Sequence, residues 1–270
     1  YGTPAITGTE SKTNVWTNGK AIYHFEGNSN DSLNTYNGSD DTINYSATSG
    51  KIGQHAIFNG STSWISINTM TFNTSTVLAW YSADVENYSE IMLGKGADDY
   101  NYIFDFYNDN YIYCRTGSSG WAYKYAYTYT TKDDWNMWTH RRTTTSSQKL
   151  WQNVTNKTAT SISTNNTDFS INQIGRYSST ADSGAFWLDG RLSELWIFTD
   201  DKVDDWVTAV YNNVENYATF ITIDGAVSIG SSPIQVYPVW PTSTSHTGTV
   251  AAGIGIAAAI STQSDFNRSV

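Results

Sequence analysis

Five aromatic residues occupy every second position in one short stretch of the chain. They are Trp121, Tyr123, Tyr125, Tyr127 and Tyr129. Because successive side chains of a β-strand point to opposite faces, a strand here would place all five rings on one face. Such a face could be a partly exposed platform on which sugar rings stack, with tyrosine hydroxyls bonding at its rim. It could equally be a ladder of core residues paired across strands, and the spacing leaves both interpretations open.

The segments just before this stripe also have strand-like patterns. Tyr102, Phe104 and Phe106 alternate with other residues, so they are predicted to share one face of a strand. Cys114, the single cysteine, lies in the next apolar run at 111–115. One cysteine excludes an intrachain disulfide, and no Cys–His motif accompanies it. We therefore expect a buried, unreactive thiol rather than a nucleophile.

The acidic residues are poorly placed for catalysis. Many of them form adjacent pairs, at 98–99, 133–134, 200–201 and 204–205. Neighbours on a strand point to opposite faces and cannot converge on one substrate. The chain also lacks a Gly-x-Ser-x-Gly elbow, a phosphate-binding loop and a His/Cys cluster with the spacing of a zinc site. We expect that the protein is not an enzyme.

Charge and hydropathy argue against two classes of partner. The formal net charge is −10, whereas proteins that bind the phosphate backbone of nucleic acids do so through clustered Lys and Arg. No run of 18 apolar residues occurs, so no membrane-spanning helix is predicted. We expect neither a nucleic-acid partner nor membrane insertion.

The elements that must position these residues are mostly strands. Aromatic residues make up 15% of the chain, and their rings suit pleated sheets. Short alternating runs are separated by turns rich in Asn, Gly, Ser and Asp, without the intervening helices of a parallel sheet. The predicted strands lie at 21–25, 55–58, 63–67, 77–80, 102–106, 111–115, 138–143, 149–152, 169–174 and 193–198. One helix is predicted at 204–213, where acids stand at the start and apolar residues have helical spacing.

Four segments carry a resemblance to a known family. They are 21–32 (AIYHFEGNSNDS), 50–67 (GKIGQHAIFNGSTSWISI), 174–177 (IGRY) and 186–198 (FWLDGRLSELWIF). In this order they resemble the opening and closing strands of the laminin-G-like branch of the concanavalin A-like lectin/glucanase superfamily. The resemblance covers roughly 19–213 and implies an all-β, antiparallel jelly-roll β-sandwich. Trp138-Thr-His140 resembles the family's Trp-x-His strand, whose histidine is usually packed in the core or at an edge.

The resemblance also implies a metal site. Many members of the superfamily hold calcium at the edge of the sandwich, and Ca²⁺ takes several oxygen ligands. The corresponding candidates are Glu26 and Asp31 after the first strand, with Asp189 and Glu194 near the closing strand. The family usually has an Asp-Glu pair where this chain has Ser193-Glu194, so one oxygen donor is weakened. Asn and Asp in segment 26–31 are also ordinary turn residues, so a plain turn is the alternative to a calcium cofactor.

The glucanases of the superfamily use a Glu-x-Asp-x-Glu strand to supply an acid and a nucleophile. This chain contains no such triplet. The resemblance therefore implies a binding module rather than a hydrolase.

We expect three regions along the chain. Residues 1–18 are predicted to be an incoming strand and linker, and 19–217 the laminin-G-like sandwich with its short terminal helix. Residues 218–270 are predicted to be a β-rich extension, in which the apolar run 250–260 pairs with another subunit or domain, or else forms a small sheet of the chain's own.

Two functions fit these features. The first is a non-catalytic, lectin-like recognition module of a surface-exposed protein, which binds glycans or another cell-surface ligand in adhesion or host recognition. The second is a structural surface subunit of a virion or cell envelope, in which the sandwich is a rigid exposed unit that contacts other subunits. Abundant Asn, Thr and Tyr with little Lys suit an extracellular, cell-surface or virion-surface location.

Overall fold

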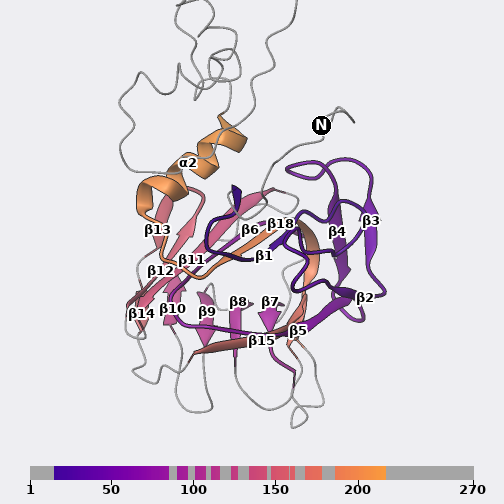
Figure 1. Ribbon diagram of the computed structural model, residues 1–270, viewed down its shortest axis with the longest axis horizontal. Helices are drawn as coiled ribbons and strands as arrows, with labels where there is room; N and C mark the ends of the chain where they lie inside the picture. Colours follow the sequence, from indigo (N-terminus) through magenta and orange to yellow (C-terminus); the bar gives the residue numbers. More distant parts are fainter. Residues whose placement is uncertain are drawn as a thin grey trace, which may run out of the picture. The chain divides into compact units, whose positions relative to one another are not determined.

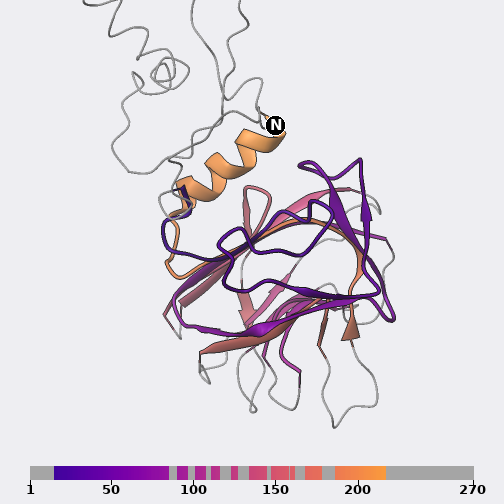
Figure 2. The same cartoon turned by 45° about the vertical axis from the view of Figure 1, so that its right-hand side comes forward.

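The computed structural model describes residues 15–84, 90–96, 101–107, 111–115, 123–126, 134–144, 147–157, 159–161, 168–177 and 186–216. The chain divides into two units, Tyr1–Val203 and Asp204–Val270. In the first unit two large sheets face each other across a shared core, and a small third sheet has two strands (Figures 1 and 2). The predicted all-β antiparallel sandwich is confirmed. The segments 1–14 and 217–270, which include the predicted apolar run 250–260, lie outside the described residues.

The first sheet has the strand order β13-β12-β11-β6-β18-β4-β3, and β1 pairs with β18 beside this path. Its strands are β1 (Gly19–Tyr23), β3 (Asn44–Ser46), β4 (His55–Asn59), β6 (Ser75–Ala83), β11 (Asn136–Thr144), β12 (Ser147–Gln152), β13 (Thr155–Lys157) and β18 (Asp189–Phe198).

The second sheet has the order β14-β10-β9-β8-β7-β15-β5-β2. Its strands are β2 (Ser39–Asp41), β5 (Trp64–Phe72), β7 (Glu90–Gly94), β8 (Tyr102–Tyr107), β9 (Tyr111–Arg115), β10 (Tyr123–Ala126), β14 (Ala159–Ser161) and β15 (Phe169–Ile174). The third sheet pairs β16 (Arg176–Tyr177) with β17 (Phe186–Trp187).

Strand β18 is the centre of the first sheet. One edge pairs with β6, while the other edge pairs with β4 in its first half and with β1 in its second half. The register against β6 shifts between Leu192 and Glu194, as expected where one residue bulges out of a strand. The bulged Ser193 donates from its hydroxyl to the Ile52 carbonyl at 2.9 Å and accepts from the Ile52 amide at 3.1 Å. The first strand and the last strand of the sandwich are therefore neighbours in one sheet.

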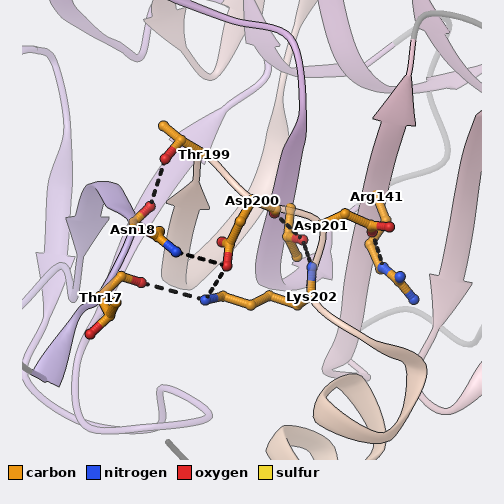
Figure 3. A network of polar contacts seen from close by, with 8 residues as sticks. Thr17, Asn18, Arg141, Thr199, Asp200, Asp201 and Lys202 are labelled. Carbon is orange, nitrogen blue, oxygen red and sulfur yellow. Dashed lines mark hydrogen bonds and ion pairs between the residues drawn. The ribbon is translucent and has the colours of Figure 1, made fainter. Parts of the chain in front are cut away.

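Polar side chains fasten the end of β18 to the turn that precedes β1 (Figure 3). The Asp200 carboxylate accepts from Asn18 Nδ2 at 3.1 Å and pairs with Lys202 Nζ at 2.9 Å. The Asp201 carboxylate pairs with Arg141 Nε of β11 at 2.5 Å. Burial acts to raise the pKa of Asp201, but the bonds and charge of Arg141 outweigh it and hold that pKa below its usual value. The contacts join three segments that are far apart in the sequence.

The core contains side chains from the inner faces of both large sheets. Phe106 of β8 packs against Tyr81 of β6 and Trp138 of β11, with ring centroids 5.1 and 5.4 Å apart. The Tyr81 hydroxyl also donates across the sandwich to the Glu90 carboxylate at 2.7 Å. Burying large aromatic side chains provides the main favourable contribution to folding.

His140 is a fully buried core residue, as the resemblance implied. Its ring stands edge-on to Phe104 and Phe169, and its Nε2 lies 2.8 Å from Gln148 Oε1. Because burial disfavours the charged ring, the pKa of His140 falls to about 4. Cys114 is also buried, as predicted, and burial raises the pKa of its thiol to about 12.

The predicted helix is α2 (Asp204–Glu215), which extends two residues beyond the expected end at 213. Asp204 and Asp205 occupy its first turn, where the helix dipole favours negative charge. Among the described residues, no helix is long and apolar enough to cross a membrane.

We predict that His140→Gln makes stability less dependent on pH. The folded-state pKa of about 4 lies below the usual 6.5, so the unfolded chain binds a proton first as pH falls. The stability that this histidine contributes above pH 6.5 is therefore lost between about pH 6.5 and 4. Urea unfolding should show that the wild type loses about 3 kcal/mol more than the variant between pH 7.5 and 4. Equal losses would contradict a buried neutral imidazole.

We also predict that the Cys114 thiol reacts with Ellman's reagent only after unfolding, because it is buried and protonated. The native chain should release no thiolate colour over an hour, and full reaction should follow in guanidinium chloride. A second thiol introduced by Val154→Cys, at a position that is 45% exposed, should react at once in the native state. Rapid native reaction of Cys114 itself would show that the core around it opens.

Candidate functional site

The outer face of the second sheet carries a second group of aromatic side chains. On β9, Ile112 and Cys114 face the core, so the alternating Tyr111 and Tyr113 face outward. The outward group consists of buried Ile91, Tyr102, Tyr113 and Tyr177, with half-buried Tyr107, Tyr111 and Phe186 packed against it. This sheet therefore has apolar surface on both faces.

Strand β8 corrects one prediction about this surface. Tyr102, Phe104 and Phe106 were expected on one face, but the register against β9 shifts between Tyr102 and Asp105. Phe104 has a φ of 59° within this irregularity. Tyr102 consequently belongs to the outward group, while Phe104 and Phe106 belong to the core. A bulge cannot be predicted from an alternating pattern, because it moves the following side chains to the opposite face of the sheet without any change in residue type.

The small β16–β17 sheet lies against the outer side of β7, and Gly94 permits the close approach. A Cβ atom at Gly94 would stand 2.6 Å from the Arg176 carbonyl oxygen and 2.9 Å from Tyr177 Cβ. The Tyr177 ring meets the Tyr102 ring edge-on with centroids 5.8 Å apart. The two-stranded sheet thus forms an additional layer that brings Arg176 and Trp187 onto the outer face.

Arg176 lies against the rings of two tryptophans on this face. Its guanidinium carbon lies 3.6 Å from the centroid of Trp64 on β5 and 5.0 Å from that of Trp187 on β17. Trp64 Nε1 donates to Asp41 Oδ2 at 2.8 Å, and Arg176 Nε donates to Gln173 Oε1 at 3.3 Å. We call these five residues the tryptophan–arginine cluster.

Exposure and charge make this cluster a candidate binding site. Trp64, Arg176 and Trp187 are half-buried, and Asp41 is exposed. Burial lowers the pKa of Arg176, and the Asp41 carboxylate acts in the opposite direction; a guanidinium remains a cation at neutral pH. The cluster therefore offers flat apolar rings beside a fixed positive charge, which are the groups that stack on sugars and hydrogen-bond to them.

The predicted aromatic stripe lies largely outside the described residues. Trp121, Tyr127 and Tyr129 fall in undescribed segments, and of Tyr123 the backbone alone is described, in β10. Tyr125 is fully buried in the core. Tyr125 is therefore a core residue, as the alternative interpretation of the stripe proposed. For the other four aromatic residues the sugar-stacking platform stays a prediction.

The four predicted calcium ligands make different contacts in the structure. The buried Asp31 carboxylate accepts four backbone amides, from Ile22, Leu33, Thr35 and Tyr36, at 2.8–3.1 Å. These bonds use the lone pairs that a cation would need, so Asp31 has the turn-forming role that was the alternative. Within the described ranges no three His, Cys, Asp or Glu side chains are placed to hold a metal ion. Calcium binding stays a prediction.

The other three candidates make different contacts. Glu26 Oε1 accepts from the Gln54 amide at 3.3 Å, and Asp189 begins β18 opposite Asn59. The buried Glu194 carboxylate lies 2.7 Å from both His24 Nδ1 and Trp196 Nε1.

The Glu194–His24 pair links β18 to the end of β1. Burial raises the pKa of Glu194. Burial acts to lower the pKa of His24, but the hydrogen bond and charge of Glu194 outweigh it and raise that pKa. We assign this pair a structural role, because it fastens the first strand to the last.

Comparison with known proteins supports the fold. The sequence matches no family model and no curated protein. Among solved structures, it is similar to domain 4 of AbnA, a GH43 extracellular arabinanase from Geobacillus stearothermophilus solved with arabinotriose. The identity is 20%, the TM-score is 0.51, and the match covers 71% of this chain and 97% of that one.

Two toxin domains are also similar. The binding domain of Paraclostridial Mosquitocidal Protein 1 matches at 14% identity and a TM-score of 0.53, over 68% of this chain and 49% of that one. The binding domain of botulinum neurotoxin DC, solved with SialylT, matches at 8% identity and a TM-score of 0.54, over 75% and 52%. This chain spans about half the length of those toxin domains. At such identities the likeness shows a shared β-sandwich fold.

We predict that Gly94→Ala disturbs the cluster, because the new methyl group would meet backbone atoms of the β16–β17 sheet. The free energy of unfolding should fall by about 1–3 kcal/mol, the usual cost of overpacking. Gly96→Ala is a comparison for unfolding stability alone, since its Cβ would meet a side-chain atom, Gln173 Nε2 at 2.6 Å, rather than backbone. Equal losses in the two variants would argue against close packing of β16 on β7.

Proposed function

We propose that this chain is a non-catalytic carbohydrate-recognition module of an exposed protein that acts outside the cell or on a cell or virion surface. The observation that carries the proposal is the tryptophan–arginine cluster, in which two half-buried indoles flank a guanidinium on the outer face of a sheet. Indole rings pack on the apolar faces of sugars, and a guanidinium supplies several hydrogen-bond donors to sugar oxygens.

The fold is consistent with this proposal. The similar arabinanase domain was solved with arabinotriose, and one similar toxin binding domain with SialylT. The first is one domain of an extracellular arabinanase, and the second is named as a binding domain of a neurotoxin. The superfamily resemblance in the sequence, to lectins and laminin-G-like modules, favours the same class of function.

The absence of catalysis remains part of the proposal. The acid–base pair of the closing strand, Glu194 with His24, is committed to hydrogen bonds inside the fold. Glu194 is 2% exposed, so it is not available to a polysaccharide. Steady release of reducing sugar from a bound polysaccharide would contradict this part of the proposal.

The alternative, a structural surface subunit, depended on the apolar run 250–260. That run lies outside the described residues, and no contact among the described residues favours the alternative over recognition. It stays a prediction.

We predict that Trp64→Ala and Trp187→Ala each weaken saccharide binding by about fivefold or more, because a ring at the centre of a binding site contributes more than about 1 kcal/mol. Glycan-array screening of the whole chain identifies a ligand, and isothermal titration then measures its affinity for each variant. Trp135→Ala is the control: Trp135 is also half-buried, but it lies beside His55 and Arg191 of the first sheet. Unchanged affinity in both cluster variants, with the fold intact, would remove the cluster as the site.

A further inference from the structure

We propose that Arg176 makes the tryptophan–arginine cluster selective for a saccharide that carries a single carboxylate, such as a uronic acid residue in an oligosaccharide. This inference rests on the proposed carbohydrate recognition and names the ligand class. It follows from three properties of the guanidinium: its hydrogen bonds, its orientation and its electrostatic surroundings.

The hydrogen-bonding capacity of Arg176 is only partly used. A guanidinium has five N–H donors, and within the described part of the chain the Arg176 side chain makes one hydrogen bond, from Nε to Gln173. Gln173 is buried, whereas Arg176 is half-buried. The internal bond therefore fixes the Nε side of the group, and the two terminal nitrogens are left for a ligand.

The orientation of the guanidinium is fixed by stacking. With the Trp64 centroid at 3.6 Å and the Trp187 centroid at 5.0 Å from its carbon atom, the planar group lies against both rings, which restrict its rotation. Arg176 and Trp187 are also direct cross-strand partners. A planar guanidinium that is already oriented matches the two oxygens of a carboxylate through parallel hydrogen bonds. A single sugar hydroxyl has one oxygen and cannot accept both of these parallel hydrogen bonds in the same way.

Asp41, the acidic member of the cluster, does not form an ion pair with Arg176. The Asp41 carboxylate influences the pKa of Arg176, so the two charges interact. Yet Asp41 accepts from the Trp64 indole, and no hydrogen bond or ion pair joins it to Arg176. An anionic ligand would therefore meet an unoccupied guanidinium, with Asp41 as a nearby repulsive charge that weakens binding.

The net charge of −10 limits the ligand further. A strongly acidic protein repels polyanions at long range, so heavily sulfated or polyuronic chains are disfavoured. At short range, in a half-buried site of reduced dielectric, one guanidinium still attracts one carboxylate strongly. Long-range repulsion of polyanions and short-range attraction by Arg176 together favour a saccharide with one carboxylate among neutral sugar units.

The test compares matched oligosaccharides. Neutral oligosaccharides that end in one glucuronic or galacturonic acid residue are titrated into the whole chain, alongside the same molecules with the carboxyl group reduced to an alcohol. We expect the acidic member of a pair to bind about tenfold more tightly, and Arg176→Gln to abolish this preference. Arg176→Lys should keep part of it, since lysine retains the charge without the planar fork. Arg191→Gln, a change to an arginine of the first sheet, should have no effect.

A gain of affinity gives an independent test if the Arg176 variants do not fold. Asp41→Asn removes the repulsive charge, while the amide oxygen can still accept from Trp64. It should tighten binding of the acidic members severalfold and leave the neutral members unchanged. Circular dichroism of each variant reports whether the sandwich is intact.

The outcomes separate this inference from the function on which it rests. Equal binding of acidic and neutral members, with loss in Trp64→Ala, would overturn the carboxylate preference and leave carbohydrate recognition standing. Tighter binding of sulfated members than of carboxylated ones would also overturn it. Binding of no saccharide by the wild-type chain would overturn both.

Discussion

The pairing of the first and last strands of the sandwich is the constraint on which the structure depends. β18 receives β6 along one edge and divides the other edge between β4 and β1. The Ser193 bulge, the Glu194–His24 pair and the contacts of Asp200 all secure this arrangement. Without β18 the first sheet would separate into unpaired groups of strands, and the second sheet would lose the apolar face against which it packs.

The candidate site exists because the second sheet is covered on both sides. Its inner face completes the core, and its outer face carries aromatic rings together with the β16–β17 sheet. Gly94 is the position that allows this extra layer. A short segment that contributes little to the main core therefore sets the positions of Arg176 and Trp187. Binding residues held in this way can change during evolution at little cost to the sandwich, which is consistent with a fold shared by proteins of low sequence identity.

Much of the fold could be predicted from local pattern, but the site could not. Alternation located most strands, and helical spacing with acids at the start located the helix. The burial of His140 and Cys114 also followed. The pairing of the first strand with the last was not predicted, because it depends on contacts between residues far apart in the sequence. Tyr102 was placed on the wrong face because the bulge in β8 leaves no mark in residue type. The cluster was missed because Trp64, Arg176 and Trp187 belong to three strands and share no spacing. The sequence signal that was available is the aromatic next to a charge in Arg176-Tyr177 and the aromatic pair Phe186-Trp187.

The outermost strands of the two large sheets have a consequence for solubility. In the described part of the chain each of these sheets ends on three-residue strands: β13 and β3 in the first, β14 and β2 in the second. Two of the three residues of β2 are aspartates, and all three are exposed. A short outer strand with two charged residues, such as β2, offers little template for the backbone of another molecule. Backbone pairing between two copies is therefore disfavoured at this end of the second sheet.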